Sequence, residues 1–564
     1  MSFSLPDNIK NYRFEYIVND LKAGAVVGAI GFPQSLAYAL IAGVNPIYGI
    51  YTSVVAAMVS TFTGNSSHMI IGPTNIMALA VASSLNFLQG ENYLQGVFLL
   101  TLLVGIIQIL LGVLKLGKLV NYVSHSVFVG LMTGVAVIIS ISQLGNLLGL
   151  DVELGPNIFV TLYRIAFHLE EVNYYSLGTG ALTFALLLLL QKKKPRFPSY
   201  IIAVVVSAVF VYLFRLGDQI IIVDDFRAST PDFVLYGFDY NLILEVFSSA
   251  LSIALLGFLH IISVAKELEK ETQESLELNR EFIGQGIVNM TCAFTRGFAV
   301  TGSISRTFTN YKWGAKSRFS GFVSGLVTVL IFILLFPVIA YIPIPTLAVI
   351  VLLVVYKLTD WEEIVLIFKT TRFDSLIFSV TFLITVISTR LDYAIYFGVL
   401  LSFILVLKNS SSISYTHFRY NGDEKESFSR RSLQQVEEDD CIIINLAGTL
   451  HFNSAENLKN ELNETFSEDK VFVVRMREIE DIDLTSVQEL DKFIEKVQNN
   501  GGEVVLSGVS ENMYRVLEQF GVTARIKKEN IFTGDGKFFA STKEALARAE
   551  DEYEKNVEDN GGSR

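Results

Sequence analysis

Two short segments of this chain combine residue types that can bind an anion through backbone N–H groups. Residues 72–75 read Gly-Pro-Thr-Asn before an apolar run, and residues 301–306 read Thr-Gly-Ser-Ile-Ser-Arg. Proline suits the first turn of a helix, and Thr and Ser hydroxyls cap its N–H groups. A helix N-terminus leaves N–H groups unpaired and carries about half a positive charge. The two segments therefore predict two helix starts that can hold an anion.

The second segment also carries a permanent positive charge, Arg306. A guanidinium is protonated at any physiological pH, and an arginine at membrane depth is a functional candidate by default. Ser303 and Ser305 place hydroxyls beside it. The alternatives are that Arg306 extends to the membrane surface or neutralises a carboxylate such as Glu281.

A third set of polar residues follows a proline in the first apolar run. Pro33 frees a backbone carbonyl, which a membrane helix tolerates only where protein or a cavity repairs the loss. Gln34 and Tyr38 are four residues apart and share one helix face beside that break. Both supply polar donors beside the break, the alternative being an ordinary kink with a packed tyrosine.

Long apolar runs must position these residues. Hydrophobic residues make up 51% of the chain and charged residues 18%, and several windows approach the about 20 residues that cross a bilayer. We predict fourteen membrane segments, two of them half-length. They lie near 21–43, 47–62, 73–88, 93–114, 120–148, 174–190, 198–215, 241–265, 282–296, 302–312, 317–341, 345–357, 373–389 and 391–408.

Charge and spacing predict how these segments are arranged. Basic residues gather in loops on one side of the alternating count, for example at 192–196, so both termini are predicted to be cytoplasmic. Charged residues before the first apolar run argue against a cleavable signal peptide. Pro33 precedes Pro73 by a spacing similar to that between His260 and Ser303. This similarity predicts a seven-segment unit repeated with inverted topology, as in many transporters.

The C-terminal part has a different composition. Residues 411–564 hold 19 Lys and Arg against 31 Asp and Glu, which accounts for the whole formal charge of −12. This acidity argues against nucleic acid as a partner. Strand-like runs alternate with amphipathic helical ones, which predicts a small α/β domain. The two cysteines and six scattered histidines predict no metal site, and with no nucleophile–base pair or phosphate loop we expect neither an enzyme nor a bound cofactor.

Several motifs occur in an order that resembles a known family. PQSLAYALIAGVNPIYGIY, GNSSHMIIGPTN, LNREFIGQGIVNM and TGSISRTFTNYKWGAKSR are followed by GTLHFNSAENL and IEDIDLTSV. They resemble the SulP family of anion transporters, the bacterial relatives of the animal sulfate/chloride exchangers and prestin, with a C-terminal STAS domain. The resemblance implies fourteen transmembrane segments as 7+7 inverted repeats, divided into core and gate domains, and a cytoplasmic α/β STAS domain.

The resemblance also implies a site between the N-termini of the third and tenth segments. At the matching positions, the residues expected to bind the anion are Gln34, Tyr38, Thr74, Asn75, Ser303, Ser305 and Arg306.

Two further positions follow from the same resemblance. Many family members carry a carboxylate in the eighth segment, where this chain has His260. Histidine can carry a proton near neutral pH, so His260 is a candidate for proton coupling, the alternative being a buried neutral residue. Thr485 matches the phosphorylatable hydroxyl of STAS domains in anti-sigma-factor antagonists, which makes it a regulatory candidate.

The expected function is secondary active transport of small inorganic anions by an elevator-type mechanism, with sulfate as the leading substrate. Alternatives are a bicarbonate or dicarboxylate transporter, a channel-like anion conductor, or a membrane-anchored STAS scaffold. The expected partners are the anion, the lipid bilayer, a second copy in a homodimer and a cytosolic regulator of the STAS domain. A bacterial inner membrane is the expected location.

The expected domain boundaries follow the composition. They are a cytoplasmic segment (1–20), the transmembrane domain (21–408), a linker (409–430), the STAS domain (431–550) and an acidic tail (551–564).

Overall fold

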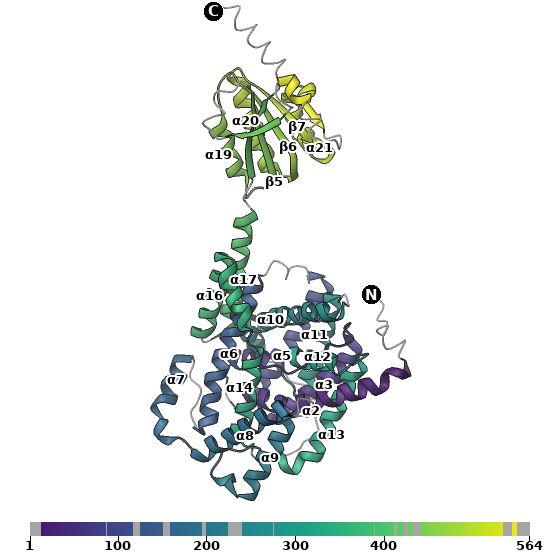
Figure 1. The fold of residues 1–564 in the computed structure, drawn as a ribbon, viewed down its shortest axis with the longest axis vertical. Helices are drawn as coiled ribbons and strands as arrows, with labels where there is room; N and C mark the ends of the chain where they lie inside the picture. The colour runs from purple at the N-terminus through teal and green to yellow at the C-terminus, as the bar shows by residue number, and fades with distance from the viewer. Residues whose placement is uncertain are drawn as a thin grey trace, which may run out of the picture. The chain divides into compact units, whose positions relative to one another are not determined.

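The computed structural model divides the chain into two compact units, residues 1–402 and 403–564 (Figure 1), which are described separately. The structure describes residues 13–85, 87–88, 90–116, 124–150, 158–193, 199–223, 240–273, 276–388, 390–410, 414–421, 427–431, 441–533 and 544–549. The predicted acidic tail and most of the predicted N-terminal segment lie outside these residues.

The helices of the first unit pack in two groups, which we name the core and gate bundles. The core bundle contains α2 (Ile17–Ile41), α3 (Pro46–Thr63), α4 (Asn75–Ser84), α5 (Gly90–Val113), α10 (Tyr240–Thr272), α11 (Leu278–Phe294), α12 (Ile304–Lys312) and α13 (Phe319–Ile339). The gate bundle contains α6 (His125–Leu148), α7 (Ile158–Phe167), α8 (Tyr174–Lys193), α9 (Ser199–Leu213), α14 (Ile344–Leu358), α15 (Trp361–Thr370), α16 (Arg372–Ile387) and α17 (Leu391–Ser410). Helix α2 lies at the boundary, where it packs against α9 and α14.

Each predicted membrane segment falls on one of these helices. The two predicted half-length segments are α4 and α12, with 10 and 9 residues. Within the described residues, eight helices are long and apolar enough to cross a membrane by length and composition. The count of fourteen spans stays a prediction. Helices α7 and α15 had no predicted counterpart, because each is an amphipathic helix of only 10 residues that includes at least one charged residue.

Glycine contacts hold the core bundle together. A Cβ on Gly105 of α5 would lie 2.7 Å from the Gly286 carbonyl oxygen of α11, and one on Gly286 would lie 2.6 Å from that of Gly105. Such close backbone approach needs small residues, as in other membrane helix pairs. Helix α13 packs against α3 as α5 packs against α11. The fourth segment of each half thus packs on the second segment of the other, as expected of a repeated fold.

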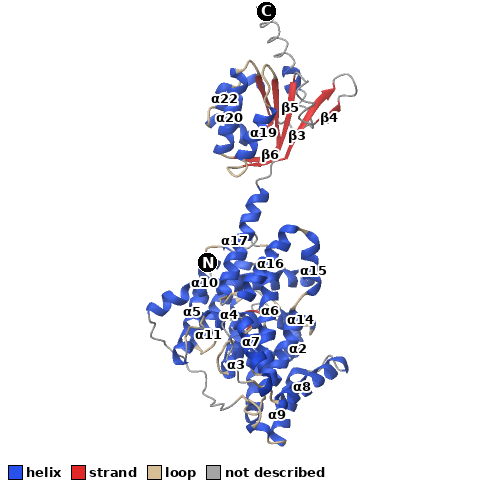
Figure 2. Ribbon diagram, turned by 90° about the vertical axis from the view of Figure 1, so that its left-hand side faces the viewer, coloured by secondary structure: helices blue, strands red, loops and turns tan. Residues whose placement is uncertain are grey.

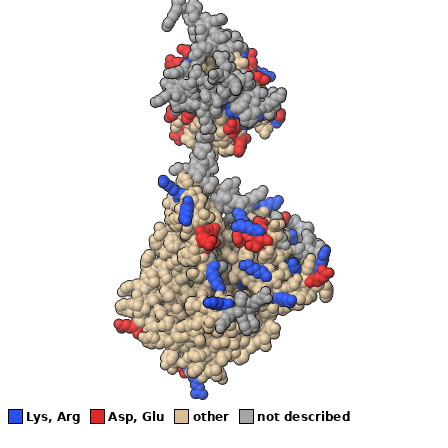
Figure 3. Space-filling view, in the orientation of Figure 1, with Lys and Arg blue, Asp and Glu red and all other residues tan. Residues whose placement is uncertain are grey.

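The surface of the first unit suits a bilayer. Large apolar side chains point outward, for example Leu334 with 66% of its surface exposed. Figure 3 shows that the lower part of this unit's visible surface is almost free of charged side chains, whereas most of its Lys, Arg, Asp and Glu gather in the upper part. This distribution is the one expected of membrane helices.

The second unit is built around a mixed sheet (Figure 2), whose strand order within the described residues is β4-β3-β5-β6-β7-β8. Strands β5 to β8 are parallel, and β3 is antiparallel to β4 and β5. The strands are β3 (Ser414–Asn421), β4 (Ser427–Arg431), β5 (Cys441–Leu450), β6 (Val471–Ile482), β7 (Glu503–Val509) and β8 (Ile531–Thr533). The helices are α19 (Ala455–Thr465), α20 (Leu484–Asn499), α21 (Glu511–Gln519) and α22 (Val522–Arg525).

Alternate residues of the central strands pack on opposite faces of this sheet. Ile442 and Ile444 belong to the core formed with α19, α20 and α21, whereas Ile443 packs with residues 545–549. The predicted α/β domain is therefore confirmed. The segment predicted as a linker (409–430) contains β3 and most of β4. Its polar composition hides the strands, whose hydrogen-bond partners lie on β5 and on each other.

Candidate functional site

The two predicted helix starts lie side by side in the core bundle. The strands β1 (Ile71–Gly72) and β2 (Thr301–Gly302), which directly precede them, pair antiparallel. The Ser303 N–H donates to the Ile70 carbonyl at 2.8 Å, and the Ile70 N–H donates to the Thr307 hydroxyl at 3.0 Å. This short ladder brings together the N-termini of α4 and α12, which are far apart in the sequence.

Both helices begin with the predicted hydroxyl caps. Thr74 Oγ1 accepts from the Met77 N–H at 3.4 Å, and Ser303 Oγ accepts from the Arg306 N–H at 3.5 Å. Each cap satisfies one of the helix's first N–H groups and leaves others without an intrahelical acceptor. Asn75 is buried in the first turn of α4, and Ser305 is half-buried in that of α12. Two sets of free N–H groups therefore meet at one place.

Arg306 connects these two helix starts. Its Nη2 donates to the Pro73 carbonyl at 3.0 Å, and its Nη1 donates to the Ser53 hydroxyl of α3 at 3.1 Å. The residue is 2% exposed, and its Nε has no hydrogen-bond partner among the described residues. None of the described carboxylates forms an ion pair with the Arg306 guanidinium. The positive charge is therefore buried without an anionic partner.

The alternative role for Arg306, neutralising Glu281, is wrong. The Glu281 carboxylate accepts from the backbone N–H groups of Asn65 and Ser66, and it lies 3.9 Å from the Arg318 guanidinium. Arg318 also donates to the Ser66 carbonyl at 2.7 Å. The pair of Glu281 and Arg318 holds the loop between α3 and β1. Glu281 is therefore not a partner of Arg306.

Gln34 and Tyr38 lie on α2 beside this arginine. Gln34 is 1% exposed, and its Nε2 has no hydrogen-bond partner among the residues described. Tyr38 is buried and lies near the Arg306 guanidinium. Buried donors without partners are rare in proteins and are expected where a ligand or water binds.

The other two predicted residues lie elsewhere. His260 of α10 is 3% exposed, and its ring stacks on Phe128 of α6 with 5.9 Å between centroids. It therefore lies where the core bundle meets the gate bundle. Thr485 belongs to the second unit, where it is exposed in the first turn of α20, after the cap that Asp483 makes with the Ser486 N–H.

Several positioning residues were missed by the sequence reasoning. Asn289 of α11 accepts from the Val300 N–H at 2.7 Å and donates to Gln108 at 2.8 Å, while Gln285 donates to the Val300 carbonyl at 3.1 Å. These buried amides hold the segment that leads into β2. Their signal in the sequence is the i, i+4 spacing of two polar residues in an apolar helix.

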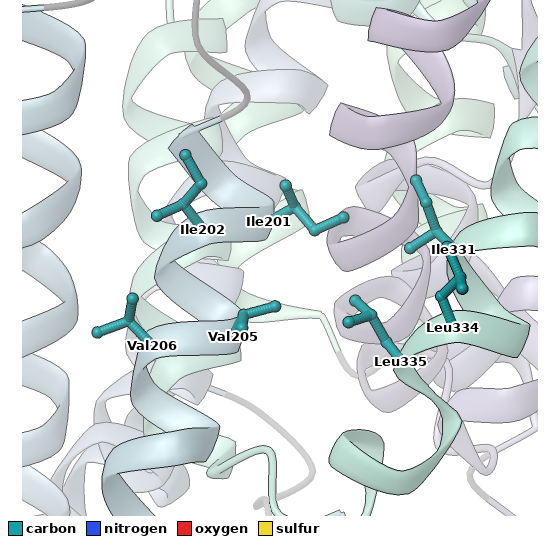
Figure 4. Close-up of a pocket in the computed structure, with 7 residues that line it drawn as sticks. All are labelled: Ile201, Ile202, Val205, Val206, Ile331, Leu334 and Leu335. Atoms are coloured by element: carbon teal, nitrogen blue, oxygen red, sulfur yellow. The ribbon is translucent and has the colours of Figure 1, made fainter.

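A cleft of about 330 Å³ lies elsewhere, between α9 and α13 (Figure 4). All of its lining residues are aliphatic: Ile201, Ile202, Val205, Val206, Ile331, Leu334 and Leu335. With no donor and no charge in its lining, this cleft does not suit an anion.

Family models match both compact units of this chain. The sulfate permease family matches residues 17–381, and the STAS domain matches residues 432–545. The chain is 28% identical to the putative sulfate transporter YvdB of Bacillus subtilis, over 93% of this chain and 97% of that protein. It is 26% identical to sulfate transporter 4.1, chloroplastic, of Arabidopsis thaliana, over 93% and 80%.

Two solved structures share the fold. The structure of SLC26A9 matches with a TM-score of 0.86 and 19% identity, over 98% of this chain and 93% of that one. The transmembrane domain of the cyanobacterial bicarbonate transporter BicA matches with a TM-score of 0.59 and 23% identity, over 70% and 97%.

Proposed function

Because this chain belongs to the sulfate permease family, we propose that it is a secondary active transporter of small inorganic anions, with sulfate as its leading substrate. The anion binds between the N-termini of α4 and α12. Its site is lined by Gln34, Tyr38, Thr74, Asn75, Ser303, Ser305 and Arg306.

The observation that carries this proposal is the buried charge of Arg306. A charge removed from water is costly unless it is paired. Arg306 has only neutral hydrogen-bond partners among the described residues, at Ser53 and Pro73. The free N–H groups of two helix starts lie beside it and also favour negative charge. An anion supplies the partner that this site lacks.

The relatives suggest which anion it is. YvdB and the Arabidopsis protein are named as sulfate transporters, and a bicarbonate transporter shares the fold. Sulfate is therefore the first substrate to test, followed by bicarbonate and dicarboxylates.

We propose an elevator-type mechanism, in which the core bundle carries the anion along the gate bundle. All the proposed binding residues lie on α2, α4 and α12 of the core bundle or at the caps of α4 and α12. None of the described gate helices supplies one of these residues, so the site can move with the core as a unit.

Uptake by purified protein in liposomes tests this function. Labelled sulfate is supplied, with bicarbonate, chloride and fumarate as competitors at two pH values. We expect saturable sulfate uptake that Arg306→Gln lowers by about 100-fold, because a charge-assisted pair in a dry site contributes about 3 kcal/mol. Lys312→Gln, at the exposed end of the same helix, is the control. Undiminished uptake by Arg306→Gln would contradict the site, and turnover far above carrier rates would indicate a channel.

His260 is the proposed coupling residue for protons. Its position at the boundary of the two bundles, with Nδ1 lacking a hydrogen-bond partner among the described residues, supports this role. We expect wild-type uptake to change between pH 6 and pH 8 and His260→Ala to lose that change. If the variant keeps the wild-type pH profile, His260 does not couple protons.

Thr485 is the proposed regulatory residue of the second unit. Thr485 is exposed at a helix start, where a phosphate would meet free N–H groups. We propose that its phosphorylation, or a cytosolic regulator bound nearby, modulates transport.

We further propose a homodimer in a bacterial inner membrane with both termini in the cytoplasm. Uptake by Thr485→Glu and Thr485→Ala, and the mass of the purified complex, test these points.

A further inference from the structure

Two short helices of the gate bundle, α7 and α15, have apolar faces that no described part of the chain covers. Each follows the fifth predicted membrane segment of its half of the chain, α6 in the first half and α14 in the second. In the predicted inverted repeat these fifth segments run in opposite directions, so α7 and α15 are expected at opposite membrane surfaces. We name these two helices the amphipathic pair.

Helix α7 has a buried aliphatic face and an exposed aromatic face. Ile158 and Ile165 are buried on one side of the helix. Phe159, Tyr163 and Phe167 follow one another at intervals of four residues, and each is more than half exposed. The rings of Tyr163 and Phe167 stack with 6.1 Å between their centroids. An apolar face of this kind on a protein surface marks a site of interaction.

Helix α15 is built in the same way. Ile367 is buried in a small core that joins α15 to α6 and α16. Trp361, Val365 and Phe368 form a stripe at intervals of four and three residues, and each is about half exposed. Charged residues such as Lys369 lie beside this stripe. The helix therefore presents an apolar stripe and a charged stripe to its surroundings.

The amphipathic pair lies at opposite ends of α6. At the start of α6, the His125 side chain is hydrogen-bonded to Glu363 of α15. Near its end, a Cβ on Gly145 would lie 4.0 Å from the Ile165 side chain of α7. An α-helix separates positions 125 and 145 by about 30 Å, which is about the thickness of the hydrocarbon core of a bilayer. The amphipathic pair thus has the spacing of the two lipid headgroup boundaries.

The surface between the amphipathic pair is apolar. Helix α16 packs against both α7 and α15. Its residues Leu376, Leu383 and Ile387 are about half exposed, and its two charged residues lie in its first turn. An apolar band that is bordered at both ends by aromatic residues is the pattern of a lipid-facing surface.

We infer that α7 and α15 bind the lipid headgroup boundaries of opposite leaflets and thereby fix the depth of the gate bundle in the bilayer. The rings of Tyr163 and Trp361 suit this boundary, because they are apolar and each carries one polar group that can reach water. The charged residues of both helices oppose deeper insertion. A second copy of the chain would have to cover both ends of α6, whereas a single bilayer covers both faces.

This inference concerns lipid binding and goes beyond the proposed transport function. Only its consequence rests on the proposed elevator motion: a gate bundle that is held at both membrane surfaces stays in place while the core bundle moves.

Quenching of Trp361 fluorescence in liposomes tests the inference. The chain has two tryptophans, and Trp313→Phe leaves Trp361 as the single one. Lipids that carry a spin label quench only nearby tryptophans. We expect a label near the headgroup to quench Trp361 at least about twofold more than a label near the chain end, because an interfacial helix reaches only the boundary of the acyl chains.

The same measurement applies to α7 and to a control helix. Tyr163→Trp, made in a chain with both natural tryptophans replaced by phenylalanine, should show the same preference for the headgroup label. Leu330→Trp in that chain is the control, because Leu330 is exposed halfway along α13. It should be quenched more strongly by the label near the chain end.

A charge in the apolar stripe of α15 should weaken its binding to lipid. Val365→Glu should lower quenching of Trp361 by the headgroup label about twofold, because a carboxylate is costly among acyl chains. Lys369→Gln, in the charged stripe, is the matched control and should leave the quenching unchanged. If Trp313→Phe does not fold, the difference between the wild type and Trp361→Phe gives the signal of Trp361.

Three results would overturn the inference. Quenching by aqueous iodide and by neither lipid label would place α15 in water. Protection from iodide and from both lipid labels would show that a second copy of the chain covers the helix. Stronger quenching by the label near the chain end would place α15 inside the hydrocarbon core. None of these measurements requires transport, so a failure of the proposed function would leave their outcome unaffected.

Discussion

At the proposed site, the Arg306 guanidinium lies against Gly72, where there is no room for a larger side chain. A Cβ on Gly72 would lie 2.5 Å from Arg306 Nη1, which is closer than atoms approach without displacement. A Cβ on Gly31 would lie 3.4 Å from Nε, which is an ordinary contact distance. The guanidinium therefore occupies a space that Gly72 leaves open, and its position depends on that glycine.

Gly72→Ala should displace the guanidinium and impair sulfate uptake by at least about tenfold. Overpacking of this kind typically costs 1–3 kcal/mol, and about 1.4 kcal/mol corresponds to a factor of ten. Uptake into liposomes is the measurement. Gly178→Ala on α8 is the control, because a Cβ there meets no atom within 4 Å. Wild-type uptake by Gly72→Ala would show that the position of Arg306 is not critical.

The buried pair of Glu281 and Arg318 should stabilise the fold and should not bind the substrate. Glu281→Gln leaves the arginine buried without its anionic partner and should destabilise the fold by about 3–5 kcal/mol. Thermal unfolding in detergent measures this. Glu267→Gln, in an exposed ion pair with Lys270, should change stability by less than about 1 kcal/mol. Equal effects of the two variants would contradict the structural role.

At the scale of elements, the β1–β2 ladder is what joins the two halves of the site. It contains two residue pairs, Ile71 with Gly302 and Gly72 with Thr301. Two further bonds join Ile70 to the start of α12: its carbonyl accepts from the Ser303 N–H, and its N–H donates to the Thr307 hydroxyl. Because so few bonds hold the starts of α4 and α12 together, each should affect the geometry of the anion site.

Thr307→Val removes the acceptor of the Ile70 N–H while keeping the shape of the side chain. A buried N–H without a partner costs about 1–3 kcal/mol, so we expect a lower melting temperature and weaker protection by sulfate. Thr309→Val is the control, since the Thr309 hydroxyl donates within its own helix, to the Ser305 carbonyl. The role of the ladder is refuted if both valine variants melt and bind alike.

At the scale of the whole molecule, each compact unit has its own hydrophobic core. In the second unit, β3 protects one edge of β5 through five residue pairs, from Ser414 with Ala447 to Phe418 with Ile443. An unpaired edge strand favours aggregation. The boundary of a stable soluble fragment should therefore precede β3.

A fragment of residues 411–550 should be more stable than one of residues 431–550. We expect the shorter fragment to melt about 5 °C lower or more and to aggregate, because it lacks the strand that covers β5. Thermal unfolding and size-exclusion chromatography measure both effects. If the two fragments melt together and are both monomeric, β3 and β4 do not belong to the stable domain.

Local signals made much of this protein predictable. Apolar runs located the helices, hydroxyl caps located the starts of α4 and α12, and ordered motifs indicated the family. The short helices α7 and α15 were missed because each has only 10 residues, about half the length that crosses a bilayer. Strands β3 and β4 were assigned to a linker because their composition is polar.

The sequence by itself determined that two polar helix starts and one arginine lie within membrane-type segments, because caps, breakers and apolar length act over a few residues. Only the tertiary structure decided what those residues contact. It paired β1 with β2, directed Arg306 to Ser53 and Pro73 instead of Glu281, and placed Glu363 beside His125. These contacts join residues far apart in the chain, so no local pattern of residue types specifies them.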